Sequence, residues 1–212
     1  IINQVKFCSM HLLLQLIIIL ISCTTSLEGI SSTNQISKPI KAIELYLEGN
    51  YIEAIKKWET LAENGEEKSQ FILGTIYRIG NESVSKNIDK AIKWYSLAAE
   101  KGNAYAQYNL GKIYESEKGS IDYELAAKWF MLGAQNGNAF SQLKLGSFYI
   151  KGKGVPKNIR YAHMWLNISG AQGNYQAINK KKFLEKTMPF SELKAARILA
   201  KKCYRNNYKN CL

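Results

Sequence analysis

The chain has 212 residues, 46% of them hydrophobic, which is enough for one domain of ordinary size or for a short solenoid with a continuous core. Its 29 basic and 17 acidic residues give a formal charge of +12, and residues 174–212 hold ten of the basic and two of the acidic ones. The positive charge therefore gathers at the C-terminal end. Of the two histidines, only His163 lies beyond the N-terminal apolar run, which excludes a metal centre built on several histidines.

The first residues have the pattern of an export signal. An apolar run from Leu12 to Ile21 has the length of a signal-peptide core and is too short to span a bilayer. The run ends in Leu20-Ile21-Ser22-Cys23, which resembles a bacterial lipobox. That resemblance implies a signal peptide over residues 1–22 and lipidation of Cys23. The alternatives are a plain secretory signal with an incidental cysteine and an uncleaved membrane anchor.

Residues 23–39 are rich in serine and threonine and lack apolar periodicity, so we expect a flexible tether. The residue after Cys23 is Thr24 rather than aspartate. In the bacterial lipoproteins that this segment resembles, a residue other than aspartate at this position favours sorting to the outer membrane, if the organism has one. We therefore expect a lipid-anchored protein of the cell envelope. A soluble secreted or periplasmic protein is the alternative.

From residue 40 onward a helical pattern recurs every 35 to 37 residues. Leu-Gly-x-x-Tyr appears around Gly74, Gly111 and Gly146, and a segment with alanine and tryptophan and a closing glycine follow each copy. Apolar residues three and four apart indicate two helices in each unit, and the small glycine of the first helix lets the second approach closely. A period of this length indicates a repeat array, with units at 40–65, 66–102, 103–137 and 138–173.

The pattern Ala-x-x-x-Leu-Gly-x-x-Tyr, Gly-x-Gly-Val-x-x-Asn, Ala-x-x-Trp and a closing glycine resembles the Sel1-like repeat, a relative of the tetratricopeptide repeat. The likeness is best at 138–173 and extends over residues 41–187. It implies an all-α, right-handed α-solenoid of about four hairpins used as an adaptor. We expect no cofactor. Trp58 lies one residue after the position expected for the repeat tryptophan, Lys57, so we expect the first unit to be a plain tetratricopeptide hairpin that caps the array.

The first helix of each unit has a face opposite its packed leucine and tyrosine, and we expect that face to bind a partner. Helical steps of three and four residues place Tyr105, Tyr108 and Lys112 on it. In stacked repeats this face lines a concave groove, where an extended peptide or a helix could lie against aromatic side chains. The alternative is that the apolar members pack against second helices of neighbouring repeats. The predicted groove residues are Lys68, Phe71, Arg78, Tyr105, Tyr108, Lys112, Phe140, Leu143 and Ser147.

Residues 174–212 are expected to form a helical cap. One helix is predicted over 175–186, and Pro189 suits the first turn of a last helix that reaches Cys203. Cys203 and Cys211 indicate a disulfide in an exported chain, whereas a metal site would need further ligands that lie nowhere near in sequence. The lysines of the cap, Lys180 to Lys182 among them, could meet phospholipid, lipopolysaccharide or nucleic acid. Export argues against nucleic acid, and a solvated cap is the simpler interpretation.

We find no catalytic constellation in the sequence. His163 occupies a packed repeat position, which favours a partly buried structural residue over a Ser/His/Asp arrangement. The adjacent acids Glu66 and Glu67 lie at a helix start without the cleft that a glycosidase needs. We expect a non-catalytic protein that binds another protein or peptide. The alternative is a cell-envelope enzyme or a repeat protein that interacts with peptidoglycan or β-lactams, although these repeats lack the cysteine pairs of the proteins discussed for that activity.

Overall fold

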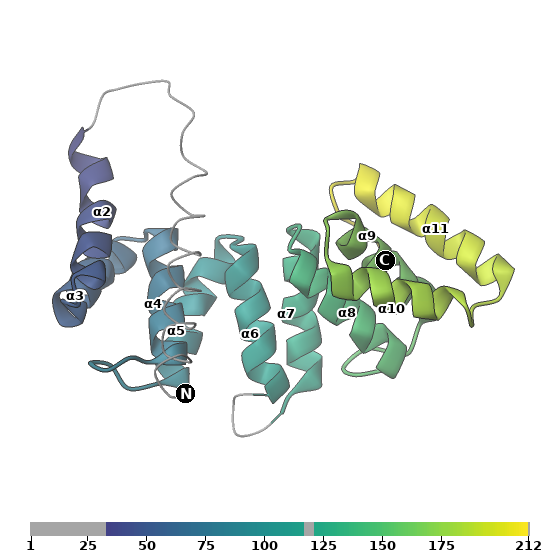
Figure 1. The fold of residues 1–212 in the computed structure, drawn as a ribbon, viewed down its shortest axis with the longest axis horizontal. Helices are drawn as coiled ribbons and strands as arrows, with labels where there is room; N and C mark the ends of the chain where they lie inside the picture. Colours follow the sequence, from purple (N-terminus) through teal and green to yellow (C-terminus); the bar gives the residue numbers. More distant parts are fainter. Residues whose placement is uncertain (1–32, 117–120, 212) are drawn as a thin grey trace. The chain divides into compact units, whose positions relative to one another are not determined.

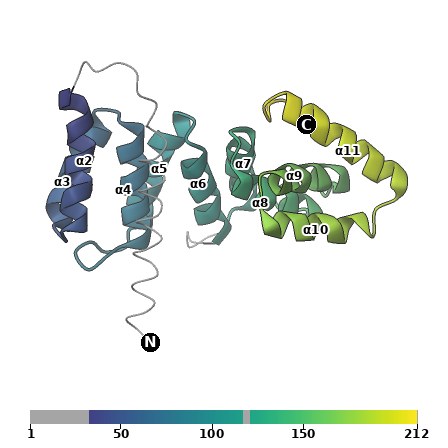
Figure 2. The same cartoon turned by 45° about the horizontal axis from the view of Figure 1, so that its top comes forward.

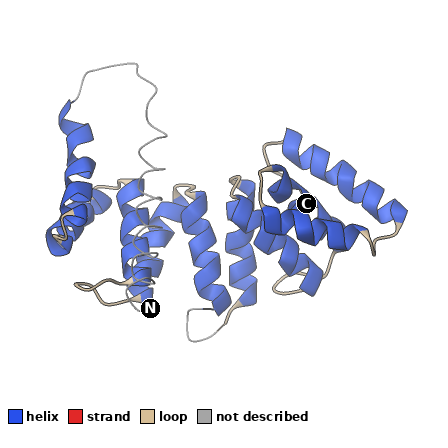
Figure 3. Cartoon of the chain, in the orientation of Figure 1, coloured by secondary structure: helices blue, strands red, loops and turns tan. Residues whose placement is uncertain are grey.

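The computed structural model describes residues 33–116 and 121–211, and all regular structure in these residues is helical (Figures 1 and 3). This confirms the all-α prediction. The helices are α2 (Thr33–Leu47), α3 (Tyr51–Glu63), α4 (Glu67–Ile79), α5 (Ile88–Glu100), α6 (Ala104–Ser116), α7 (Tyr123–Gln135), α8 (Ala139–Lys151), α9 (Ile159–Ala171), α10 (Tyr175–Glu185) and α11 (Phe190–Arg205).

The predicted signal peptide, Cys23 and most of the predicted tether lie outside the described residues. Helix α2 begins at Thr33, however, so residues 33–39, which we expected in the tether, are helical. Pro39 lies inside this helix and removes only one backbone donor, and Ala42 and Leu45, which follow it, are buried in the core. None of the described helices combines the length and the hydropathy needed to cross a bilayer.

Residues 38–212 belong to one compact unit, in which helices α3 to α10 pack in chain order and α11 packs against α9. Helix α4 packs against α5, α6 against α7 and α8 against α9, and each hairpin also packs against the next, as the two views in Figures 1 and 2 show. Buried side chains from Ala42 to Ile113 form one cluster and those from Ala126 to Cys211 form a second, and Tyr114 of α6 packs against both. The core therefore continues from hairpin to hairpin, as expected of a solenoid.

A glycine in the first helix of three hairpins makes room for a large side chain of the second. A Cβ atom built on these glycines would lie 2.5, 2.6 and 2.8 Å from the nearest atom of the partner side chain, in chain order. Real Cβ atoms essentially never come this close, so the prediction of close helix approach at the glycine is confirmed. The pairs are Gly74 with Tyr95, Gly111 with Phe130 and Gly146 with Leu166.

The same packing position accounts for the tryptophan of the first unit. Counted back from the closing glycine, Trp58 occupies the place of Tyr95, Phe130 and Leu166 in the later units. All four side chains are at most 1% exposed. The second helix of the first unit, α3, is therefore in register with the later repeats and fills the common core position with a larger side chain.

Asparagine or aspartate side chains cap the N-terminal ends of six of these helices. Each accepts a hydrogen bond from a backbone N–H group in the first turn that has no partner within the helix. The closing glycines of the four units have φ between +85° and +92°, a left-handed conformation that suits a helix end. Pro189 is the N-cap of α11 rather than a residue of its first turn. The capping residues are Asn87, Asn103, Asp122, Asn138, Asn158 and Asn174.

Candidate functional site

Four aromatic side chains form a row across the first helices α4, α6 and α8. The ring centroids of Phe71 and Tyr105 are 6.4 Å apart, and those of Tyr108 and Phe140 are 5.8 Å apart. Tyr105 and Phe140 are 50% and 53% exposed, respectively. We call Phe71, Tyr105, Tyr108 and Phe140 the aromatic row. All four belong to the predicted groove, and the structure brings them together in pairs from neighbouring hairpins.

The less exposed members of the row are held by second helices. Phe71 is 7% exposed and packs on Tyr95 at 5.8 Å, and Tyr108 packs on Phe130 at 6.0 Å. Leu143, another predicted groove residue, is also only 7% exposed. The alternative of packing within the array therefore describes Phe71 and Leu143, but it does not describe Phe140. The exposed rings thus rest on rings that are fixed in the core.

The polar members of the predicted groove differ in their surroundings. Lys68 is exposed on α4, and Arg78 and Lys112 are partly buried. Burial and the nearby Glu115 carboxylate together raise the pKa of Tyr108, so its phenol stays protonated at neutral pH and can donate a hydrogen bond. The face therefore combines exposed rings with hydrogen-bond donors.

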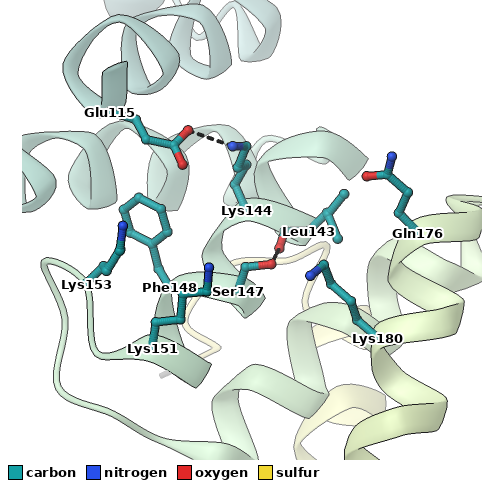
Figure 4. Close-up of a pocket in the computed structure, with 9 residues that line it drawn as sticks. All are labelled: Glu115, Leu143, Lys144, Ser147, Phe148, Lys151, Lys153, Gln176 and Lys180. Atoms are coloured by element: carbon teal, nitrogen blue, oxygen red, sulfur yellow. Dashed lines mark hydrogen bonds and ion pairs between the residues drawn. The ribbon is translucent and has the colours of Figure 1, made fainter.

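A basic pocket opens at the α8 end of this face, and Figure 4 shows the side chains that line it. Its volume is about 200 Å³, and helices α6, α8 and α10 and the segment after α8 contribute to it. We use the name basic pocket for this site. Its charged lining residues are Glu115, Lys144, Lys151, Lys153 and Lys180.

Two of the four lysines already have partners. The Lys144 amino group lies 2.6 Å from the Glu115 carboxylate, and the Lys153 amino group donates to the Tyr123 hydroxyl at 2.8 Å. Among the described residues, no ion pair is formed by the exposed Lys151 or Lys180. These two amino groups are therefore the ones available to an anion.

The neutral polar groups of the pocket also differ in what they can offer. The Ser147 hydroxyl donates to the backbone oxygen of Leu143 at 3.0 Å, which leaves only its lone pairs for a ligand. Gln176 of α10 brings an amide that can donate or accept. Figure 4 shows Lys180 reaching from α10 toward the side of α8 on which Ser147 lies.

Sequence reasoning placed Leu143 and Ser147 on the binding face but missed the lysines around them. Lys144, Ser147 and Lys151 follow one another at steps of three and four residues on α8, so they share one side of that helix. That spacing is the signal that could have identified the α8 wall of the pocket. Lys180 belongs to the predicted basic cap, and no pattern in the neighbouring sequence indicates that it lies near α8.

His163 is a fully buried structural residue. Its Nε2 atom lies 2.9 Å from the Glu185 carboxylate of α10, which Arg197 of α11 also contacts at 3.4 Å. Burial lowers the pKa of His163 below 6.5 even though Glu185 acts in the opposite direction, so the imidazole is neutral at pH 7 and donates to Glu185. Partial burial alone would raise the pKa of Glu185, but the hydrogen bonds from His163 and Arg197 lower it overall.

The predicted disulfide between Cys203 and Cys211 is present, with Cα atoms 4.7 Å apart. It ties the tail to the end of α11, and the Lys209 amino group in the closed loop donates to the Asn136 side chain at 2.6 Å. The loop therefore also contacts the turn between α7 and α8. Within the described part of the chain, no three His, Cys, Asp or Glu side chains are grouped as a metal site would require.

The hairpins, their glycine contacts and the continuous core define an all-α repeat protein. The Sel1 repeat family matches residues 67–103, 104–138 and 139–174, so the chain belongs to this family. Proteins with Sel1 repeats typically serve as protein-interaction scaffolds and are usually non-catalytic.

The solved structures that are similar to the chain include the following two. A Sel1 repeat protein from Oxalobacter formigenes is 34% identical with a TM-score of 0.55, over 60% of this chain and 96% of that one. The protein c5321, a protective antigen present in uropathogenic Escherichia coli strains, displays an SLR fold and is 24% identical with a TM-score of 0.51, over 84% of this chain and 47% of that one. No match was found among curated proteins.

Proposed function

We propose that this protein is a non-catalytic adaptor that binds a segment of another protein across the first helices of its hairpins. The observation that carries the proposal is the aromatic row. Tyr105 and Phe140 present about half of their surface to solvent, and each meets a ring from the neighbouring hairpin, Phe71 or Tyr108. The row thus has members on the first helices of three successive hairpins.

Aromatic side chains held in this way are well suited to binding. A ring that is already fixed loses little conformational entropy when a partner covers it, and tyrosine adds a hydrogen-bonding group to its apolar surface. Tyrosine, tryptophan and arginine residues contribute most of the binding energy in many protein interfaces. The row would accordingly supply the central contacts, and the surrounding polar side chains would orient the partner.

We also propose that the protein acts in the cell envelope, attached to a membrane through a lipid on Cys23. The lipobox-like sequence at the end of the apolar run supports this location, as does the disulfide between Cys203 and Cys211, which suits an oxidising compartment. The intact mass of the protein from its native membrane fraction tests this proposal. A chain that begins at an acylated Cys23 is expected, and an unmodified Cys23 would contradict the lipid anchor.

Site-specific photo-crosslinking tests the binding face. A photo-reactive aromatic residue in place of Tyr105 or Phe140 should give an adduct with the same partner protein from both positions. Leu132 on α7 is 42% exposed and lies on a second helix, so it is the matched control position and should not give that adduct. Equal crosslinking from Leu132, or none from the row, would contradict the proposed face.

Substitution of the row gives the complementary measurement. Tyr105→Ala combined with Phe140→Ala should weaken binding of the crosslinked partner by about tenfold or more, because two anchoring rings are lost. Both side chains are half exposed, so the melting temperature should change little. A variant that binds as well as the wild type would show that the partner lies elsewhere.

A further inference from the structure

We infer that the basic pocket receives an acidic side chain of the protein segment that lies on the aromatic row. This inference rests on the proposed function and specifies the chemistry of the partner: an apolar or aromatic residue, followed or preceded at short distance by aspartate or glutamate. The pocket opens on the face that carries the row, and Phe140 and Ser147 lie on the same helix, α8.

The charge of the lining selects for an anion. Four lysines and one glutamate give the pocket a net charge of +3 when all are ionised. Glu115 neutralises Lys144, but Lys151 and Lys180 remain without an ion-pair partner among the described residues. Like charges that converge on one small volume repel one another, so an entering carboxylate both gains attraction and relieves repulsion.

The size of the pocket limits what enters it. A volume of about 200 Å³ is below the range of about 300–1,000 Å³ that is common for small-molecule sites, so it suits one side chain better than a whole cofactor. The contact between Glu115 and Lys144 at its edge already shows a carboxylate held by one of these lysines. A side chain from a partner could make the same contact with Lys151 or Lys180.

The distance between the row and the pocket sets the spacing in the partner. Phe140 and Ser147 are seven residues apart on α8, which corresponds to about 10 Å along the helix axis. An extended peptide advances about 3.3 Å per residue and so covers this distance in about three residues. A partner segment that crosses the aromatic row and then follows α8 from Phe140 to the pocket should therefore have its acidic residue about three positions from the residue that contacts Phe140.

Selection of random peptides of about 12 residues on the immobilised protein tests this chemistry directly. The wild type should enrich peptides that have aspartate or glutamate about three positions from an aromatic or aliphatic residue. Lys151→Glu combined with Lys180→Glu should abolish the preference for acidic residues. It should also weaken the binding of a selected peptide by about tenfold or more, as measured by fluorescence anisotropy. The same double change at Lys128 of α7 and Lys201 of α11, both exposed, is the matched control and should leave both results unchanged.

A gain of binding separates the pocket from general damage to the fold. Glu115→Gln removes the internal carboxylate that competes for Lys144, so the selected acidic peptide should bind several-fold more tightly. Misfolding cannot produce this result. Weaker or unchanged binding by this variant would overturn the inference.

The remaining outcomes distinguish the inference from the proposed function. Peptides that bind through the aromatic row without acidic enrichment would overturn the role of the pocket and leave the adaptor proposal standing. Absence of peptide binding together with absence of crosslinks from Tyr105 and Phe140 would overturn both. Vesicles containing phosphatidylglycerol are the third probe, and if they bind in a manner that requires Lys151 and Lys180 while acidic peptides do not, the pocket takes lipid phosphate and the inference is wrong.

Discussion

Replacing Gly111 with alanine tests how closely the two helices of a hairpin are packed. The new Cβ atom would lie 2.6 Å from two ring atoms of Phe130, and that ring is fully buried, so it cannot move aside without displacing its neighbours. Overpacking of this kind typically costs about 1–3 kcal/mol. Alanine returns about 1 kcal/mol through its higher helix propensity. We therefore expect Gly111→Ala to lower the free energy of unfolding by up to about 2 kcal/mol.

Urea unfolding followed by circular dichroism measures this effect as a lower midpoint with an unchanged slope. Phe130→Leu supplies the control, because a smaller side chain leaves room for the added methyl group. The alanine should cost less in the Phe130→Leu background than in the wild type, and the difference is the coupling between the two positions. If Gly111→Ala raises the midpoint, helix propensity outweighs packing and the close-approach argument is refuted.

Other contacts lead to further expectations. Replacing Cys203 and Cys211 by serine should lower the free energy of unfolding by about 2.5 kcal/mol, and a reductant should then affect only the wild type. Asn158→Ala should cost about 1 kcal/mol by removing a helix cap, which Asn158→Asp should retain in the same urea titration. Acidification from pH 7.5 to 5.5 should lower the melting temperature of the wild type more than that of His163→Gln. Below pH 6.5 the imidazole of His163 binds a proton more readily in the unfolded chain than in the folded one, because its pKa is lower in the folded protein, and this favours unfolding. The contribution of Glu185 to stability is lost only at lower pH, because its pKa is lowered in the folded protein.

The repeat fold was predictable because its determinants are local and occur several times. The glycine and the large side chain that covers it lie in one hairpin, and three copies of the pair show the same contact. Two details were not predictable with the same ease. Trp58 was compared with the other tryptophans rather than with Tyr95, whose place it takes, and Pro39 was read as the end of a tether although α2 continues through it.

The aromatic row shows which features of the binding face can be predicted from helical periodicity. The spacing within α6 places Tyr105 and Tyr108 on one face, and that much follows from the helix alone. Exposure on this face follows the position within the repeat. Phe71 and Leu143 lie three residues before the repeat glycine and are 7% exposed, whereas Tyr105 and Phe140 lie six residues before it and are 50% and 53% exposed. Alignment of the repeats therefore separates the packed members of the face from the exposed ones, which the periodicity of one helix does not.

The basic pocket depends still more on the arrangement of whole hairpins. Lys144 and Lys151 share a side of α8 by their spacing, but Glu115 comes from the hairpin before and Lys180 from the helix after α9. Helix α10 packs mainly against α9, and the direction of that packing brings Lys180 to the pocket. A small change in the angle between α9 and α10 would separate Lys180 from Lys151 without altering any local sequence pattern. The specificity that we infer therefore depends on the packing between successive units, which no single repeat sequence encodes.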